Sequence, residues 1–204
     1  MEVIHCKDEQ EIAHKAFTWC QKQIEKHHAS SIYIPAGQTP VQLYRLWEKE
    51  KPQFLRNIDL VQIDDVLTKP KNGIFRTFLQ EHLPSYQKQI QWIGDAPKQA
   101  DLAILGLGLN GHVAFHEPGI PDHFNFGCVR LEESTVRRLD LQGEHWGITY
   151  GAGSFFAAKA VLLIVSGSGK AEVFKKFLSQ NSLFPAHKLK GHKNLEVLAT
   201  EQLK

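Results

Sequence analysis

A glycine-rich segment that ends in a Glu-Pro pair contains the residues best suited to moving protons. It reads Gly106-Leu-Gly-Leu-Asn-Gly-His-Val-Ala-Phe-His-Glu-Pro-Gly119. Its glycines permit close backbone approach, and it brings His112 near Glu117, with the amide of Asn110 just before them. Histidine titrates near neutral pH, and a carboxylate partner fixes its tautomer and raises its basicity. The segment is therefore a candidate acid–base site; the alternative is a core histidine bonded to a backbone carbonyl.

The same segment places His112 and His116 at the i, i+4 spacing of a helical zinc pair, with Glu117 adjacent. The glycines before the pair and Pro118 after it argue against a helix that would align the two rings. We therefore expect no metal at this pair.

Two other segments have the composition of anion-binding loops. In Ala36-Gly-Gln-Thr-Pro40, Gly37 removes side-chain bulk, Thr39 suits an N-cap and Pro40 suits a first helical position. Exposed amides at the positive end of a helix dipole form an anion site. The alternative is a well-capped helix that binds nothing.

The second loop, Ser166-Gly-Ser-Gly-Lys170, has a cation where a helix begins. The helix dipole disfavours a lysine there, so its presence indicates an anionic partner, unless the lysine is merely solvated. The segment lacks the spacing of a Walker motif.

Two adjacent carboxylates, Asp64 and Asp65, end a predicted strand. Side chains alternate along a strand, so only one of the two can easily face a site. The alternative is that these aspartates cap the next turn.

The elements that must position these residues alternate between strand and helix patterns. Apolar residues recur every four positions from Glu9 to about His27, which predicts an amphipathic helix. The alternation as a whole predicts an α/β fold with a mainly parallel sheet and helices on both faces. The other predicted elements are strands at Ser31–Pro35, Ile58–Ile63, Leu102–Leu105, Val161–Val165 and Leu195–Ala199, and helices after Pro40, at Gly73–Leu83 and at Lys170–Leu178.

The predicted sheet explains how the chemistry could come together. Ligands of parallel α/β sheets bind at the carboxyl ends of the strands, and all four unusual segments follow strands. We therefore expect them at one edge. The irregular region from Pro118 to Gly147 could form a mobile cover over that edge or an ordinary surface connection.

Composition limits the classes of function. The 204 residues are 42% hydrophobic and 23% charged, which predicts one folded domain over residues 1–204. The formal net charge of +2 comes from scattered basic residues, so nucleic acid is not an expected partner. The longest apolar stretches fall far short of the roughly 20 residues that span a membrane, and the first residues show no apolar stretch like that of a signal peptide, so we expect neither membrane insertion nor export. Three cysteines without CxxC spacing suit reduced thiols in the cytoplasm, with Cys20 on the core face of its helix.

At the glycine-rich segment the sequence resembles the signature of glucosamine-6-phosphate deaminases. The agreement continues along the chain in Pro35–Pro40, Ile63–Val66, Ser166–Lys170 and Pro185–Leu189, the last resembling the family's C-terminal helix. The resemblance implies the modified Rossmann-like three-layer sandwich that this family shares with 6-phosphogluconolactonases.

The resemblance also implies residue roles. Asp64 would be the base that moves a proton between C2 and C1 of the opened sugar, His112 would assist ring opening, and Glu117 would orient and charge His112. The phosphate would be held by Gly37, Gln38, Thr39 and Lys170, together with an arginine for which we prefer Arg138 over Arg137. This chemistry requires no cofactor.

Three residues depart from the family's pattern: Asn110 replaces an aspartate, His116 an asparagine and Gln38 a smaller residue. The chain also lacks a helix between Trp92 and Asp101 and much of the segment near Arg138. Three functions remain open. They are deamination and isomerisation of glucosamine 6-phosphate or galactosamine 6-phosphate, a lactonase activity that the Glu-Pro pair argues against, and phosphosugar binding without turnover. A monomer and a homo-oligomer are both compatible with the sequence.

Overall fold

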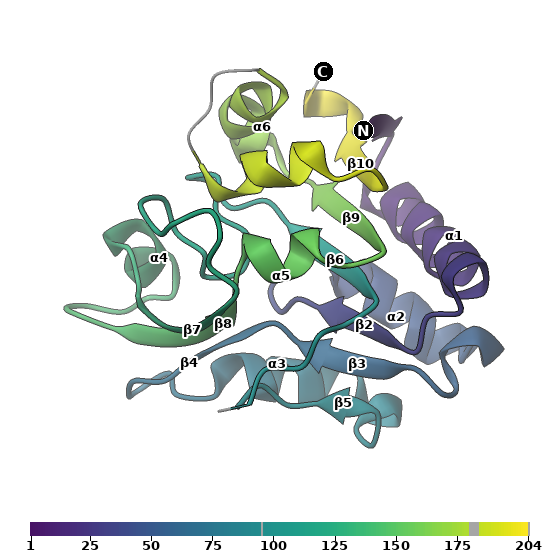
Figure 1. The fold of residues 1–204 in the computed structure, drawn as a ribbon, viewed down its shortest axis with the longest axis horizontal. Coiled ribbons are helices and arrows are strands. Elements are labelled where there is room, and N and C mark those ends of the chain that lie inside the picture. The colour runs from purple at the N-terminus through teal and green to yellow at the C-terminus, as the bar shows by residue number, and fades with distance from the viewer. Residues whose placement is uncertain (95, 180–183, 204) are drawn as a thin grey trace.

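A parallel sheet of seven strands forms the centre of the computed structural model, which describes residues 1–94, 96–179 and 184–203 (Figure 1). Every strand pair in it is parallel, which confirms the predicted mainly parallel sheet. In spatial order the strands are β1 (Glu2–Cys6), β10 (Leu195–Thr200), β9 (Ala160–Val165), β6 (Leu102–Gly106), β2 (Ser31–Ile34), β3 (Asp59–Gln62) and β5 (Ile90–Gln91).

Helices cover both faces of this sheet, as predicted. Side chains alternate along the strands, so Leu162 of β9 packs in one core and its neighbour Leu163 in the other. The first core is covered by α1 (Glu9–His27), α2 (Val41–Glu50) and α3 (Ile74–His82). The second is covered by α5 (Ala152–Phe156), α6 (Ala171–Leu178) and the 3₁₀ helix η4 (Pro185–Gly191).

The first helix matches its predicted bounds because its ends are specified locally. The Asp8 carboxylate accepts a hydrogen bond from the Glu11 N–H at 2.8 Å, and His28 ends the helix in a left-handed conformation. Cys20 is fully buried on its core face, as predicted. None of the helices in the described ranges combines the length and apolar character needed to cross a membrane.

A second, antiparallel sheet of three strands lies beside the carboxyl edge of the first, and the sequence did not predict it. It consists of β4 (Asp64–Val66), β8 (Trp146–Tyr150) and β7 (Phe126–Arg130), with the short helix α4 (Glu133–Arg138) packed beside it (Figure 1). A small core that includes Phe115 and Val136 holds these elements together. The region from Pro118 to Gly147, called the cover below, therefore has regular structure: it contains β7, α4 and the start of β8.

The second sheet corrects the predicted position of the two aspartates. Strand β3 ends at Gln62, and Asp64 and Asp65 begin β4, where Asp64 pairs with Thr149. Ile63 lies between the two sheets: its N–H donates to the Ile34 carbonyl, and its carbonyl accepts from the Tyr150 N–H. Asp64 therefore lies at the seam between the two sheets.

Candidate active site

A cavity of about 530 Å³ opens at the carboxyl edge of the central sheet. It gathers loops that are far apart in sequence, as the parallel topology predicts. The predicted residues that line it are Gly37, Gln38, Thr39, Asp64, His112, Arg138 and Lys170. Asn110 and Glu117 lie behind His112 rather than on the wall. A smaller cavity of about 240 Å³ between Lys51 and Gln89 has no carboxylate or imidazole in its lining.

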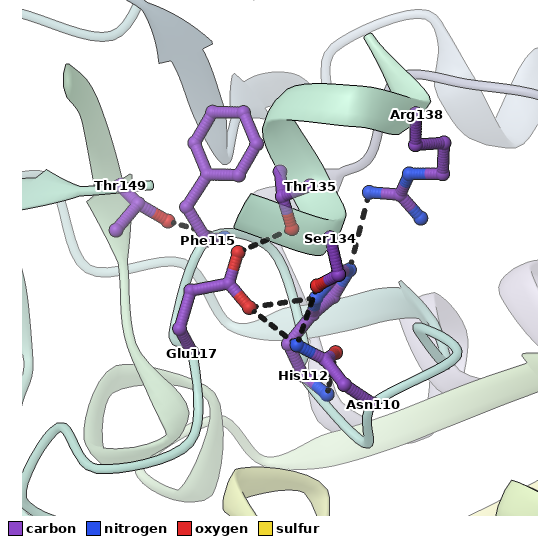
Figure 2. A network of polar contacts seen from close by, with 8 residues as sticks. All are labelled: Asn110, His112, Phe115, Glu117, Ser134, Thr135, Arg138 and Thr149. Carbon is purple, nitrogen blue, oxygen red and sulfur yellow. Dashed lines mark hydrogen bonds and ion pairs between the residues drawn. The ribbon is translucent and has the colours of Figure 1, made fainter. Parts of the chain in front are cut away.

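A buried carboxylate organises the acid–base residues. Glu117 Oε2 accepts from the Asn110 amide at 2.9 Å and lies 3.0 Å from His112 Nδ1 (Figure 2). Its other oxygen, Oε1, accepts from the Thr135 hydroxyl. Burial alone would raise the pKa of Glu117, but these hydrogen bonds, first of all that of His112, hold the pKa below its ordinary value. Glu117 is therefore ionised at neutral pH.

The contacts of His112 define its tautomer. Arg138 Nη2 lies 3.3 Å from His112 Nε2, and a guanidinium can only donate, so Nε2 accepts (Figure 2). The proton of the neutral ring is then on Nδ1, which donates to Glu117. Nε2 is the ring nitrogen left to exchange a proton with a ligand in the cavity.

The glycines of the loop have specific structural roles. A Cβ atom on Gly108 would lie 2.2 Å from the His112 ring, so only glycine permits the ring to pack there. Gly111 has a φ of 85°, a left-handed conformation that favours glycine. The Asn110 side-chain oxygen accepts from the His112 N–H at 3.3 Å, and the Gly108 N–H donates to the His112 carbonyl at 2.9 Å. The loop thus closes on the histidine that it carries.

The two adjacent aspartates have different surroundings. Asp64 lines the cavity, and burial, followed by the charge of Asp65, raises its pKa well above the ordinary value. Asp65 points away and accepts from the N–H groups of Val66, Phe75 and Arg76. It therefore satisfies donors at the start of α3, while Asp64 remains available to a ligand.

The loop before α2 lines the cavity, but not with the predicted cap. The helix begins at Val41 after Pro40, which has a helical conformation, and no side chain caps it. Thr39 instead lies against Gly106, where an added Cβ would be 3.1 Å from its hydroxyl. Gly37 has a φ of 93°. Thr39 was thus wrongly predicted as an N-cap, because its side chain packs against the neighbouring loop.

In the second glycine-rich loop, Lys170 ends a 3₁₀ turn, η3 (Ser168–Lys170). The helix α6 begins at the next residue, Ala171, one position later than predicted. Lys170 is half-buried, and burial together with the charge of Arg138 lowers its pKa to about 8. Two cations thus face one cavity, an arrangement that favours an anionic ligand.

The two candidate arginines point in different directions. Arg138 lines the cavity, whereas Arg137 lies on the exposed side of α4 and pairs with Glu133 at 3.4 Å. The pair is the ordinary i, i+4 contact of a helix surface.

Both ring nitrogens of His116 are occupied by the backbone. Nδ1 accepts from the Ala152 N–H at 2.9 Å, and Nε2 donates to the Ile120 carbonyl at 3.2 Å. His116 is fully buried, so it anchors the loop to α5. Within the described ranges no group of three or more His, Cys, Asp or Glu side chains could hold a metal ion.

The sequence missed the contributions of the cover to this site. Thr135, which is buried and bonded to Glu117, was not singled out, and Leu139 lines the cavity without having been predicted. Outside the cover, Phe75 of α3 and Phe115 line the cavity as well. Periodicity gives no signal for α4, because a helix of six residues is too short to show one. The Ser-Thr pair before two arginines was the available clue.

The fold and the site together define an α/β protein that holds an imidazole–carboxylate pair, a buried carboxylate and two cations in one cavity. The chain belongs to the glucosamine-6-phosphate isomerase/6-phosphogluconolactonase family, which it matches over residues 69–198.

Individual relatives agree with this membership. The chain is 30% identical over 231 aligned positions to a glucosamine-6-phosphate deaminase of Bacillus thuringiensis, covering 99% of this chain and 87% of the relative. A solved structure described as a monomeric glucosamine-6-phosphate deaminase matches with a TM-score of 0.81 and 24% identity, over 100% of this chain and 98% of that one. A 6-phosphogluconolactonase from Trypanosoma brucei matches with a TM-score of 0.76 and 17% identity, over 99% and 97%. These two structures share the fold.

Proposed function

We propose that this protein is an amino-sugar-phosphate deaminase that converts glucosamine 6-phosphate and water to fructose 6-phosphate and ammonia. The observation that carries the proposal is the placement of Asp64 in the same cavity as the His112–Glu117 pair, with Arg138 and Lys170 on its wall. The family membership and the named relatives support the same reaction.

Ring opening is assigned to His112. As an acceptor, its Nε2 atom can take the proton of the C1 hydroxyl and return it to the ring oxygen, which breaks the bond between C1 and that oxygen. Glu117 stabilises the positive charge that the imidazole carries between the two transfers. Asn110, which cannot serve as a base, holds the Glu117 carboxylate in place.

Proton transfer between the carbons is assigned to Asp64. Its carboxylate removes the C2 proton of the open aldehyde while O1 takes up a proton, which gives an enolamine. The carboxylate then returns its proton to C1 and the nitrogen gives up one proton, which leaves the ketimine. Water adds at C2 and ammonia leaves. Burial raises the pKa of Asp64 toward the range of an effective base, while Arg138 acts in the opposite direction. No metal or cofactor takes part in this sequence.

The phosphate end of the cavity is assigned to the two anion loops. Gly37, Gln38 and Thr39 line the same cavity as Lys170 of the second loop and Arg138 of the cover. Binding energy from the phosphate, remote from C1 and C2, can position the reacting carbons. Arg138 must release His112 Nε2 when it engages the phosphate, which frees that nitrogen for the sugar.

One assay separates the candidate functions. The purified protein is incubated with glucosamine 6-phosphate, galactosamine 6-phosphate and 6-phosphogluconolactone, and ammonia, ketose phosphate and acid are measured. We expect ammonia and ketose phosphate in equal amounts from an amino sugar. Acid from the lactone alone would identify a lactonase, and affinity for the amino-sugar phosphate without product would identify a binding protein. We also propose that the chain is a monomer, like the relative described as one, which light scattering tests.

Phosphosugar affinity is expected to fall as the pH rises above about 8, because the pKa of Lys170 is about 8 in the ligand-free protein. A phosphate dianion favours the charged lysine and raises its pKa, so binding takes up a proton above that pH. The dissociation constant of 2-amino-2-deoxyglucitol 6-phosphate, which has no carbonyl and cannot react, should therefore increase by up to about tenfold per pH unit.

Calorimetry in buffers of different ionisation enthalpy measures the proton uptake directly. Lys170→Ala should weaken binding by about 10- to 100-fold and remove this pH dependence. Lys175→Gln, at an exposed position of α6, is the matched control and should retain both. Affinity that stays constant between pH 7 and 9.5 would exclude contact between Lys170 and the phosphate.

A further inference from the structure

The covering helix α4 contacts both members of the acid–base pair from one side. Thr135 and Arg138 are three positions apart, so they share a face of the helix. Thr135 donates to Glu117, and Arg138 donates to Nε2 of His112 (Figure 2). One helical turn therefore bridges the two ends of the pair.

The Thr135 hydroxyl is the only side-chain donor recorded on Glu117 Oε1 among the described residues, whereas Oε2 receives both Asn110 and His112. Thr135 is 1% exposed and Glu117 is 1% exposed, so water cannot easily replace the hydroxyl. A buried carboxylate oxygen without a donor is costly. The hydroxyl thus holds the one carboxylate oxygen that Asn110 and His112 leave free, and completes the orientation of Glu117.

We propose that Thr135 is a positioning residue for the reaction: its hydroxyl fixes the Glu117 carboxylate so that the proton of His112 stays on Nδ1 and Nε2 stays an acceptor. This inference rests on the proposed deaminase function for its kinetic consequences and on geometry alone for its effect on His112. It gives the cover a role in chemistry in addition to binding the phosphate.

The groups that face His112 determine what the loss of Thr135 would do. Glu117 and Arg138 contact the ring directly, Asn110 contacts its N–H, and Asp64 and Lys170 line the same cavity. Without the Thr135 hydroxyl, Oε1 of Glu117 has no side-chain donor among the described residues, so the carboxylate can rotate and its hydrogen bond with His112 Nδ1 weakens. The two tautomers of His112 then mix, and the reactive nitrogen is less often free to accept.

Three variants test the proposal. Thr135→Val keeps the volume and removes the hydroxyl, and Thr135→Ser restores the hydroxyl without the methyl group. Thr68→Val is the matched control: the Thr68 hydroxyl is bonded to His145 and Trp146 at the far end of the second sheet and contacts no cavity residue. Thermal unfolding of each variant shows that the protein is folded at the assay temperature.

For Thr135→Val we expect kcat to fall by about 10- to 100-fold, which corresponds to the loss of one charge-assisted hydrogen bond. The KM should stay within about threefold of the parent value. The pH profile of kcat should also differ between Thr135→Val and the parent. Thr135→Ser should recover most of the activity. Thr68→Val should remain within about threefold of the parent. Parent values of kcat and an unchanged pH profile in Thr135→Val would overturn the proposal, as would failure of Thr135→Ser to recover.

Nitrogen-15 NMR of His112 provides a readout that needs no turnover. The neutral ring of the parent should show a single tautomer with the proton on Nδ1, and Thr135→Val should show nitrogen shifts averaged between the two tautomers. Identical spectra would overturn the proposal even if activity fell. A parent that forms no ketose phosphate would instead refute the proposed function, and the NMR comparison would still decide the role of Thr135.

Discussion

Asp64→Asn is expected to lower turnover of glucosamine 6-phosphate by about 10²- to 10⁴-fold, the contribution of a positioned acid–base group. Asparagine keeps the shape of the side chain but cannot accept the C2 proton and return it to C1. Phosphosugar affinity should survive, because Gly37, Thr39 and Lys170 lie on other loops of the cavity.

The neighbouring position provides the matched comparison. Asp65 accepts from the Val66 N–H of β4 and from two N–H groups at the start of α3, and it lies outside the cavity lining. Asp65→Asn turns an amide donor toward those donors and should lower the free energy of unfolding by about 1–3 kcal/mol, with a much smaller loss of activity. Two adjacent aspartates should thus separate catalysis from stability.

The stability of Asp64→Asn should change in the opposite direction. Burial raises the pKa of Asp64 in the folded protein, so the folded state binds more protons than the unfolded state above the ordinary pKa. The parent therefore loses stability as the pH rises from the unfolded pKa of Asp64 toward the folded one. Asp64→Asn removes that loss and should be as stable as the parent or more stable at pH 7.

Exchange of the C2 proton with solvent deuterium tests the assignment, measured beside equilibrium binding of the same phosphosugar. If Asp64→Asn exchanges that proton at the parent rate, another group is the base. If Asp65→Asn instead loses exchange while it remains folded, the roles of the two residues are reversed.

Gly108→Ala is expected to lower kcat by about 100-fold or more, comparable to loss of an acid–base group. The added Cβ would lie 2.2 Å from the His112 ring, so the ring must leave its place between Glu117 and Arg138. Overpacking of this kind should also cost about 1–3 kcal/mol of stability.

Gly94→Ala is the control for adding a methyl group in the same protein. Nothing lies within 4 Å of a Cβ built on Gly94, and its φ requires no glycine. Steady-state kinetics and thermal unfolding of both variants provide the test. A fully active Gly108→Ala enzyme would show that His112 need not occupy its observed position.

The central sheet could be predicted because its strands are buried on both faces and read as apolar runs between glycine or polar turns. Ala160–Val165 is fully buried along its whole length, which produces such a run. Strand β1 was not predicted, because its five residues mix polar and apolar side chains and only Cys6 is buried. The two-residue strand β5 is too short to give any pattern.

The second sheet could not be predicted, because its strands pair across long separations in sequence. Asp64 pairs with Thr149, and β4 has only three residues, too few to show a strand pattern. Strand β7 has a buried position only at Val129, so its alternation is absent from the sequence. Local composition therefore suggested an irregular cover where tertiary pairing forms strands.

The site was predictable where one segment carried several residues and uncertain where single residues had to be chosen. The glycine-rich loop brings His112, Glu117 and Asn110 together within one segment. Choosing Arg138 over Arg137 needed the orientation of α4, which depends on the packing of Val136 in the small core of the cover. Arg138 lines the cavity, whereas Arg137 pairs with Glu133 on the exposed side of α4.

The Ile63 N–H donates a hydrogen bond to the Ile34 carbonyl at 3.3 Å, which joins two segments that lead into the cavity. Ile34 directly precedes the loop at Pro35 that we propose binds the phosphate, and Ile63 directly precedes Asp64, the proposed base. The hydrogen bond therefore holds these two segments at a fixed separation. We therefore expect the cavity to select ligands by the number of carbons between the phosphate and the reacting carbons. A five-carbon sugar phosphate, one carbon shorter, would bind by its phosphate but leave its reacting carbons out of register with Asp64. We expect discrimination by chain length to appear in kcat more than in affinity.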